Sequence, residues 1–572
     1  MQDVRGPHLV LSLGTDDGVS VGQEVSVLQY GAEVARARVV KADAHSSVAT
    51  VYLAKPDALV YKLDTVRLSA APGAAPPEPG AELKPVEPGT ERLPGVPGVQ
   101  SGPPGGWMNI IPRASWTYGA LSLLATDGLV TGFAAREFHG DQLFTRGEVA
   151  TLISGALKER ERLGDQATRR STAILATLAR LYARELTFLL GRDCTDRTPL
   201  LPEQPGLWVS GHLRPIWETG EGDALLPMFQ ADATLDLGRG IIAAATVTNQ
   251  HREWQNAGRA FPYLDRWFIQ GSALGFNITL GKEYFRYGPG YTGSLMWGED
   301  APAIPMLRMD RDLRLPLLGR WRLQQMSGTY REDAGRRYVG LRTLQRSFGR
   351  RFTFGWVESY KADTSPNITI GFLPYLAYQQ LFLNGAKGIN RINVQEGFDF
   401  GYHLPSLELY SELFIDDLTA PGFIGSQGSV PRKLGWMVGA RFPHLLGDQH
   451  TDFRVEWVGT DRNTYLHRNP SISLYERGLP IGHSVGPNAR SLFLRANHRV
   501  GGRLEFTAAY QTIRQANAGI PNVASLTELT LAGAYDLGRS RSVALRVSPR
   551  SVRDLTGRTS DTQVQLLADY SF

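Results

Sequence analysis

The carboxyl-terminal two thirds of the chain alternates apolar and polar residues. In the run from Phe352 to Trp356, Phe352, Phe354 and Trp356 alternate with Thr353 and Gly355. A period of two residues is typical of β-strands that have one apolar and one polar face. The same alternation recurs in residues 407–414, 452–458, 490–500 and 503–510. Glycine, asparagine and aspartate separate these runs, so we expect a succession of antiparallel strands.

The length of this β region narrows its architecture. No convincing helix and no propeller-type repeat occurs between residue 206 and the end of the chain. A soluble sandwich unit is usually much shorter, whereas a membrane barrel uses roughly 20 residues per strand and connection, which gives about 18 strands here. We therefore predict a mainly β chain in which residues 206–572 form a large antiparallel outer-membrane β-barrel.

The last residues support this prediction. In the terminal run, Val564, Leu566, Ala568, Tyr570 and Phe572 lie on one face of a strand. An apolar face that ends on Tyr-x-Phe is similar to the assembly signal of Gram-negative outer-membrane barrels. We expect Tyr570 and Phe572 to be read by the barrel assembly machinery, and the apolar face to contact outer-membrane lipid. The start of the chain lacks a secretory signal, so we expect a trimmed or misassigned start and a periplasmic amino-terminal part.

The amino-terminal residues predict a separate small domain and a spacer. Residues 1–70 alternate short β-rich runs with glycine turns, which indicates a small β-rich, barrel-like domain. Residues 71–106 consist largely of proline, glycine, alanine and glutamate. Such a composition buries too little apolar surface to fold and favours an extended, semi-rigid linker.

Residues 107–164 predict a small helical domain. Apolar residues recur at helical spacing from Tyr118 to Leu124, and Thr145 with Glu148 forms a capping box before a second helix over residues 149–157. The pattern resembles a single S-layer homology unit, whose Thr-Arg-Ala-Glu motif contacts cell-wall polymer. The resemblance implies binding of peptidoglycan or another wall polymer by these residues: Trp116, Thr145, Arg146 and Glu148. The alternative is that they are core and capping residues.

Residues 165–205 predict an amphipathic helix and a connection. Leucines and Ile174 supply an apolar stripe over residues 165–191, among many arginines. The helix packs on the preceding helices or under the barrel, or it forms a short coiled-coil stem of a trimer. Arg180, Arg184 and Glu185 interrupt the stripe, so we expect no helix that spans a membrane.

Charge and the lack of catalytic motifs argue against nucleic-acid binding and catalysis. The chain has 61 basic and 56 acidic residues, a net charge of +5, and one cysteine. There is no basic run with interleaved aromatic residues, so we expect no nucleic-acid partner. The histidines show no metalloprotease spacing, and neither a nucleophile elbow nor a phosphate loop occurs. We predict no enzyme, no cofactor and no metal.

One segment within the barrel region carries candidate binding chemistry. The run from Tyr284 to Trp297 places Gly-Pro-Gly among aromatic residues, and it cannot continue a strand ladder. We expect it to fold into the lumen or over the barrel mouth, where aromatic faces stack on sugar rings and arginines hold carboxylates. The predicted polysaccharide contacts are Tyr284, Arg286, Tyr287, Tyr291, Trp297, Arg308 and Arg311. The alternative is an interfacial aromatic girdle with internal arginine pairs to Glu299, Asp300, Asp310 and Asp312.

The same run, continued to Pro305, resembles the signature of the capsule assembly protein Wzi family. Asp300 stands where the family tends to have asparagine, and Tyr287 where it tends to have tryptophan. The resemblance covers residues 206–572 and implies an 18-stranded outer-membrane barrel with periplasmic helices. It implies attachment or assembly of an acidic or neutral surface polysaccharide. The competing hypothesis is a wall-anchored diffusion porin, because porins with S-layer homology units share this layout.

Overall fold

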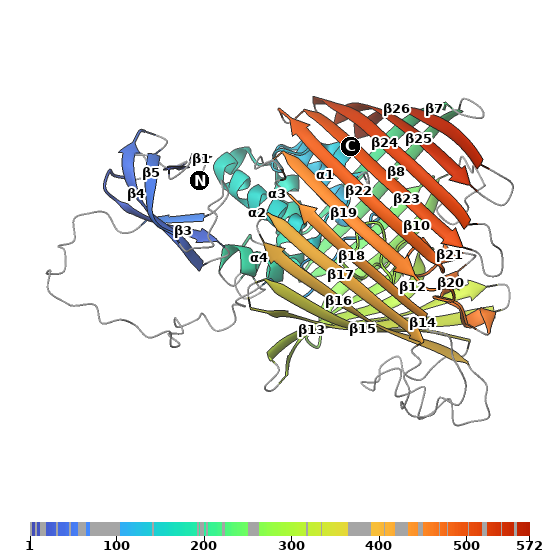
Figure 1. Ribbon diagram of the computed structural model, residues 1–572. Helices are drawn as coiled ribbons and strands as arrows, with labels where there is room; N and C mark the ends of the chain where they lie inside the picture. The colour runs from blue at the N-terminus through green and yellow to red at the C-terminus, as the bar shows by residue number, and fades with distance from the viewer. Residues whose placement is uncertain are drawn as a thin grey trace. The chain divides into compact units, whose positions relative to one another are not determined.

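The computed structural model shows the chain as two compact units, residues 1–100 with 186–194, and residues 101–185 with 195–572 (Figure 1). Each unit is described by itself. The structure describes all residues except 1–2, 6–7, 12–18, 30–31, 45–46, 55–64, 69–102, 140–141, 192–193, 195–199, 202–203, 220–223, 250–261, 316–318, 333–334, 350, 364–390, 405, 418–432, 444, 446–449, 468, 477–478, 502, 517–522, 539 and 554–557.

Eighteen antiparallel strands of the larger unit form a closed barrel (Figure 1). They are β7 (Gly206–Thr219), β8 (Ala224–Gly238), β9 (Ile241–Thr248), β10 (Tyr263–Ala273), β11 (Phe276–Glu283), β12 (Ile304–Leu315), β13 (Gly319–Glu332), β14 (Gly335–Phe348), β15 (Phe352–Ala362), β16 (Ile392–Leu404), β17 (Leu407–Asp417), β18 (Lys433–Phe442), β19 (Thr451–Thr460), β22 (Ala489–Val500), β23 (Leu504–Ala516), β24 (Val523–Gly538), β25 (Arg541–Arg553) and β26 (Arg558–Ser571). The predicted fold class is confirmed.

The two faces of the barrel wall differ in polarity, as the alternation predicts. On β7, Leu213 and Trp217 are 44% and 43% exposed, whereas His212 and Arg214 on either side of Leu213 are buried. Leu566 and Tyr570 on β26 and Leu545 on β25 are exposed in the same way. An outer surface of large apolar residues suits contact with lipid hydrocarbon, while polar residues face inward.

The barrel closes where β26 pairs with β7. At this seam the backbone N–H of Phe572 donates to the carbonyl of Gly211 at 3.0 Å, and the N–H of Gly211 donates to the Phe572 carbonyl at 2.9 Å. The Phe572 ring stacks on Phe229, with ring centroids 6.5 Å apart. A Cβ atom at Gly211 would lie 2.7 Å from the Phe572 ring, so the seam requires glycine there.

The two ends of the barrel differ in their connections. We call the end that carries Phe572 and the tight turns at residues 239–240 and 274–275 the turn end. The opposite end, from which residues 284–303 and 461–488 depart, is the loop end. Residues 461–488 include η5 (Pro470–Ile472) and the two-residue strands β20 (Tyr475–Glu476) and β21 (Leu479–Pro480).

A helical plug, residues 103–139 and 142–185, lies at the turn end and contacts β7, β8 and β26 there (Figure 1). The helices of this region are α1 (Trp116–Thr126), η2 (Ala135–Phe138), α2 (Arg146–Leu163), η3 (Gly164–Gln166) and α3 (Arg169–Leu181), and α4 (Ala183–Leu190) begins here and continues into residues 186–190 of the other unit. Both predicted helices of residues 107–164 are confirmed, whereas the single helix predicted over 165–191 is two helices that break at Tyr182. Within the described residues, no helix is long and apolar enough to cross a membrane.

Ion pairs join the plug to the barrel wall. Arg499 of β22 donates to Glu137 at 2.6 Å, and Arg180 of α3 donates to Asp236 of β8 at 2.8 Å. His139 lies 2.9 Å from Asp569 of β26. The inward polar face of the barrel therefore finds ionic and hydrogen-bonding partners on the plug.

The smaller unit contains a six-stranded antiparallel sheet in the order β1-β2-β5-β4-β3-β6. The strands are β1 (Asp3–Arg5), β2 (His8–Leu11), β3 (Glu24–Gln29), β4 (Ala32–Ala42), β5 (Ser47–Ala54) and β6 (Thr65–Leu68). This part is β-rich, as predicted, and among its described residues it forms a sheet with β1 and β6 at its edges. The predicted linker lies outside the described residues as far as residue 102.

Deleting Phe572 should impair barrel formation, because the deletion removes both backbone hydrogen bonds to Gly211 and the ring that stacks on Phe229. We expect a reduced fraction of the heat-modifiable, folded form on unboiled gels of membrane fractions. Phe506→Ala is the matched control, since Phe506 is a lipid-facing phenylalanine of β23 that is 49% exposed. If deletion of Phe572 left the fraction of folded protein unchanged, the contacts of Phe572 at the seam would not be needed for barrel formation.

Candidate functional site

The connection between β11 and β12, residues 284–303, folds into the barrel and is called the lumen segment. The N–H of Tyr287 donates to the carbonyl of Trp297 at 3.0 Å, so these residues form an isolated antiparallel bridge. Their side chains are 1% and 2% exposed. The predicted inward folding of this segment is confirmed, and its aromatic residues lie within the packed lumen.

Glu412 of β17 holds the tip of the lumen segment. Its carboxylate accepts hydrogen bonds from the N–H groups of Gly290 at 3.1 Å and Leu295 at 2.7 Å, and from the hydroxyl of Ser294 at 3.2 Å. Gly288 has φ of +120°, and a Cβ atom there would meet the Glu412 carboxylate. Glycine at position 288 therefore satisfies both the backbone conformation and the close approach.

Glu456 of β19 supports the next residues in the same way. It accepts from the N–H groups of Tyr291 at 2.5 Å and Thr292 at 2.9 Å, and from the hydroxyl of Tyr410 at 2.8 Å. The guanidinium of Arg454 lies over the Tyr291 ring, 4.2 Å from the ring centroid. Charge-assisted hydrogen bonds and a cation–π contact thus fix Tyr291.

Arg286 binds within its own segment. Its guanidinium donates to Glu299 at 2.9 Å and to the carbonyls of Gly290 and, at 3.0 Å, Tyr291. This is the internal arginine pairing that the sequence left open as an alternative. The buried guanidinium closes the Gly-Pro-Gly turn, because its donors satisfy carbonyls that have no strand partner.

Two tyrosine hydroxyls of the lumen segment also have internal acceptors. Tyr284 donates to Asp265 at 3.0 Å, and Tyr287 donates to Asp399. Burial, together with the neighbouring Asp399 carboxylate, raises the pKa of Tyr287 well above its usual value. Tyr287 is therefore a neutral hydrogen-bond donor.

Residues 461–488 fold inward against the lumen segment. The Tyr465 hydroxyl donates to the carbonyl of Leu295 at 3.0 Å, and the N–H of Gly298 donates to the carbonyl of Ile481 at 2.7 Å. His483 lies 3.1 Å from the Thr292 hydroxyl, and burial lowers the pKa of His483 to about 4. His483 is therefore neutral, and the described parts of the two connections pack together in this part of the lumen.

The two remaining predicted sugar contacts lie on β12, on opposite faces. Arg308 shares the inward face with Asp310 and donates to Thr279 at 3.3 Å. Arg311 is exposed, and its guanidinium lies 4.9 Å from the centroid of the Phe276 ring. The structure thus brings together the five residues of the lumen segment and separates Arg311 from them. A role for any of the seven in sugar binding stays a prediction.

The predicted wall-contact residues all have partners within the larger unit. Thr145 and Glu148 form the predicted capping box, with backbone bonds of 3.1 and 2.6 Å. Glu148 also pairs with Arg441 at 2.7 Å, and Arg146 pairs with Glu185 at 2.7 Å. Burial would raise the pKa of Glu185, but Arg146 holds it below its usual range. Trp116 is buried beside Trp208 of β7.

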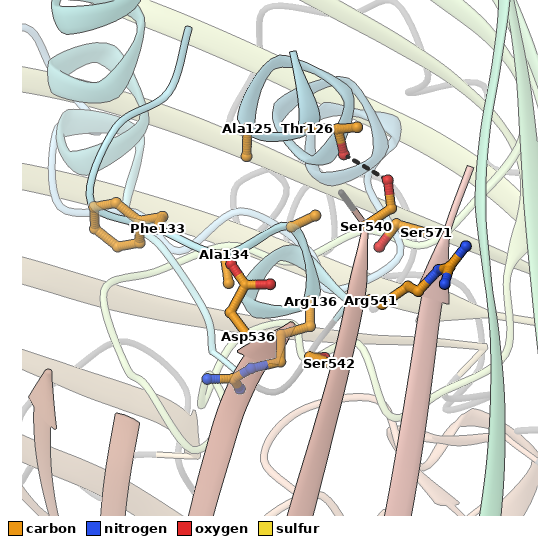
Figure 2. Close-up of a pocket in the computed structure, with 11 residues that line it drawn as sticks. Ala125, Thr126, Phe133, Ala134, Arg136, Asp536, Ser540, Arg541, Ser542 and Ser571 are labelled. Carbon is orange, nitrogen blue, oxygen red and sulfur yellow. Dashed lines mark hydrogen bonds between the residues drawn. The ribbon is translucent and has the colours of Figure 1, made fainter. Parts of the chain in front are cut away.

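A small polar pocket lies where the plug meets the turn end, and it holds about 60 Å³ (Figure 2). Arg136 and Ala134 line it from the plug, and Asp536, Arg541 and Ser542 line it from β24 and β25. Its volume suits a few water molecules rather than a sugar ring. Among the described residues, no group of three or more histidine, cysteine or acidic side chains could hold a metal ion.

The acceptors of the lumen segment were not predicted from the sequence. Glu412, Glu456 and Asp399 occur in strands more than 100 residues along the chain from the residues that they bind, whereas Asp265 of β10 lies 19 residues from Tyr284. The one available signal is a carboxylate at an inward position of a strand, which must find donors when it is buried.

Comparison with known proteins gives one family and several barrels. The family model described as capsule assembly protein Wzi matches residues 203–563. No curated protein matches the chain. Among solved structures, the chain is similar to Wzi of Escherichia coli, titled a carbohydrate-binding β-barrel involved in group 1 capsule assembly. The two share 14% identity, with 81% of this chain and 99% of that chain covered and a TM-score of 0.48.

Two barrels of Pseudomonas aeruginosa are also similar. OccK5 (OpdH) shares 12% identity, with 64% of this chain and 98% of that chain covered and a TM-score of 0.39. OprD shares 10% identity, with coverages of 64% and 95% and a TM-score of 0.38.

Replacing Tyr287, Tyr291 or Trp297 by alanine should destabilise the barrel, because each ring is buried and each substitution leaves a cavity. We expect each to lower the free energy of unfolding by about 3–5 kcal/mol, measured by thermal unfolding in detergent. Tyr402→Ala is the control, since Tyr402 is 37% exposed on β16, and it should have a small effect. Unchanged stability with loss of polysaccharide binding would instead support direct sugar contact by these rings.

Proposed function

The chain belongs to the capsule assembly protein Wzi family, and from this premise we propose that it binds surface polysaccharide at the outer membrane during capsule assembly. The family match over residues 203–563 is the observation that carries the proposal, because it spans nearly the whole barrel. The apolar outer surface of the strands supports an outer-membrane location. The proposed role is binding and anchoring rather than catalysis.

The orientation is part of the proposal. Outer-membrane barrels have short periplasmic turns and longer extracellular connections. We therefore place the turn end and its helical plug toward the periplasm, and the loop end toward the cell surface. Polysaccharide then meets the barrel from the loop end.

The lumen segment argues for a binding protein over a diffusion porin. Residues 284–303 cross from β11 to acceptors on β16, β17 and β19, and residues 461–488 pack against them. A wide channel through this part of the lumen would break these hydrogen bonds. The porin hypothesis remains as the competing outcome of the test.

The test combines binding with conductance. The detergent-purified chain should bind capsular polysaccharide isolated from the same cells, and cells that lack the chain should retain less polysaccharide at their surface. In planar bilayers we expect no stable conductance of porin size. A large, steady conductance without polysaccharide binding would support the porin and overturn the proposal.

Tethering to the cell wall is a second proposal, which rests on the resemblance of residues 107–164 to an S-layer homology unit. Its predicted contacts are engaged elsewhere, because Glu148 pairs with Arg441 of β18 and Arg146 with Glu185. A wall polymer would compete with these pairs. Exposed residues of this unit include Thr131, Gly132 and the part of α2 beyond Leu157.

Arg146→Ala tests the tether. If Arg146 contacts wall polymer, the variant should co-sediment less with purified peptidoglycan sacculi while its barrel stays heat-modifiable. Arg162→Ala is the matched control, because Arg162 is an exposed arginine of the same helix that pairs only locally with Glu159. Equal sedimentation of the wild type and both variants would show that Arg146 serves the plug alone.

A further inference from the structure

One sector of the barrel has inward-facing side chains that remain accessible. On β26, Asp569 and Ser571 point inward, because both lie beside His139 of the plug. Every second residue of a strand shares a face, so Gln565, Gln563 and Asp561 also point inward. The polar inner wall is defined as these residues and their inward neighbours on the adjoining strands: Glu218, Glu528, Thr530, Arg546, Ser548, Arg550, Asp561, Gln563 and Gln565.

The polar inner wall faces water, unlike the opposite sector. The side chains of Arg550 and Asp561 are 43% and 50% exposed, and Gln563, Gln565 and Glu218 are half-buried. Across the barrel, Glu412 and Glu456 are fully buried under the lumen segment. An inward side chain that keeps this exposure must border a hydrated part of the lumen. The lumen segment therefore fills the sector beside β17 and β19, and the sector beside β24 to β26 and β7 is called the wet sector.

The plug bounds the wet sector at the turn end. Ser542, Asp569 and Ser571 at the turn end of the same strands are buried beneath the plug. Exposure then increases along β26 toward the loop end, from buried Leu567 through half-buried Gln565 to exposed Asp561. The polar inner wall is therefore accessible from the loop end.

The wall presents a connected set of hydrogen-bonding groups. Gln565 donates to Glu218 at 3.0 Å, and Thr530 and Ser548 lie 3.1 Å apart across β24 and β25. A glutamine amide that donates once retains a second N–H, and each hydroxyl and carboxylate retains lone pairs. A sugar hydroxyl can donate and accept hydrogen bonds as water does. It can therefore replace a water molecule at these groups without loss of hydrogen bonds.

An aromatic face borders this set. Phe493 of β22 is half-buried and stacks on Tyr291, with ring centroids 5.7 Å apart. Through the strand register, Phe493 lies opposite Gln511 of β23, and Gln511 lies opposite Glu528. An aromatic ring beside convergent polar groups is the usual composition of a small-molecule site.

The charge and dimensions of the wall indicate the ligand class. Three carboxylates, those of Glu218, Glu528 and Asp561, stand against two guanidiniums, those of Arg546 and Arg550, and Arg550 donates to Asp561 at 2.8 Å. These charges nearly cancel, so a polyanionic ligand would gain no net electrostatic attraction from the polar inner wall. Four strands at about 4.8 Å spacing give a width of roughly 14 Å, enough for a short oligosaccharide.

We propose that the polar inner wall, with Phe493 at its edge, binds a neutral, hydroxyl-rich oligosaccharide stretch of the surface polysaccharide. This proposal rests on the proposed function and gives it a site away from the lumen segment. The lumen segment then acts as a support, since Tyr291 holds Phe493 in place from behind.

The test uses the purified full chain and oligosaccharides released from the same cells' surface polysaccharide by mild acid. Anion exchange separates a neutral from an acidic fraction, and calorimetry measures the affinity for each. The wild type should prefer the neutral fraction. Replacing Gln563 and Gln565 together by leucine should weaken that affinity about tenfold or more, because two hydrogen-bonding side chains are lost. Phe493→Leu should weaken it as well.

Thr562→Val is the matched control, since Thr562 directly precedes Gln563 but lies on the outer face of β26, and the variant should bind like the wild type. Heat modifiability confirms that each variant is folded. If the polysaccharide still binds but the glutamine and Phe493 variants bind as tightly as the wild type, the site is wrong and the proposed function stands. Preference for the acidic fraction overturns the ligand class. No binding of either fraction by the wild type overturns the site and the proposed function together.

Discussion

Closure of the barrel between β26 and β7 is the constraint on which the rest of the structure depends. In hydrocarbon, an unpaired backbone N–H or carbonyl costs several kcal/mol, so a transmembrane sheet can have no free edge. The last residue completes this closure, because Phe572 exchanges two backbone hydrogen bonds with Gly211. Closure also creates a lumen, and the inward half of every strand must then be hydrated or given partners.

The inward side chains of the strands are provided with partners or with water in two ways. Where the lumen is filled, buried carboxylates accept from donors that the inserted segments supply, as Glu412 does from Gly290 and Leu295. The plug does the same through side chains, since Arg499 binds Glu137 and Arg180 binds Asp236. Elsewhere, on β24 to β26 and β7, inward side chains remain exposed to water. The lumen is therefore divided into a packed sector and a wet sector.

The sequence was sufficient for features that depend on local periodicity. A period of two predicts the strands and the lipid-facing face of β26, and Thr145 with Glu148 predicts the start of α2, because the capping box lies within four residues. The inward folding of residues 284–303 follows from Gly-Pro-Gly. The partners of that segment do not follow, because Glu412 and Glu456 are brought near by barrel closure over more than a hundred residues. The separation of Arg308 from Arg311 follows from the same period of two once β12 is assigned, since residues three apart lie on opposite faces.

This division of the lumen also sets the cost that a sugar would meet at the aromatic residues of the lumen segment. The hydroxyls of Tyr284 and Tyr287 are already bonded to carboxylates, so a ligand that approached them would have to break buried hydrogen bonds before it formed its own. Groups that already face water carry no such penalty, because a sugar hydroxyl replaces a water molecule of similar hydrogen-bonding capacity. The packed sector consequently provides rigidity, as Tyr291 does behind Phe493. Recognition is favoured where the side chains are fixed by neighbours on adjoining strands and still hydrated, as Gln565 is beside Glu218.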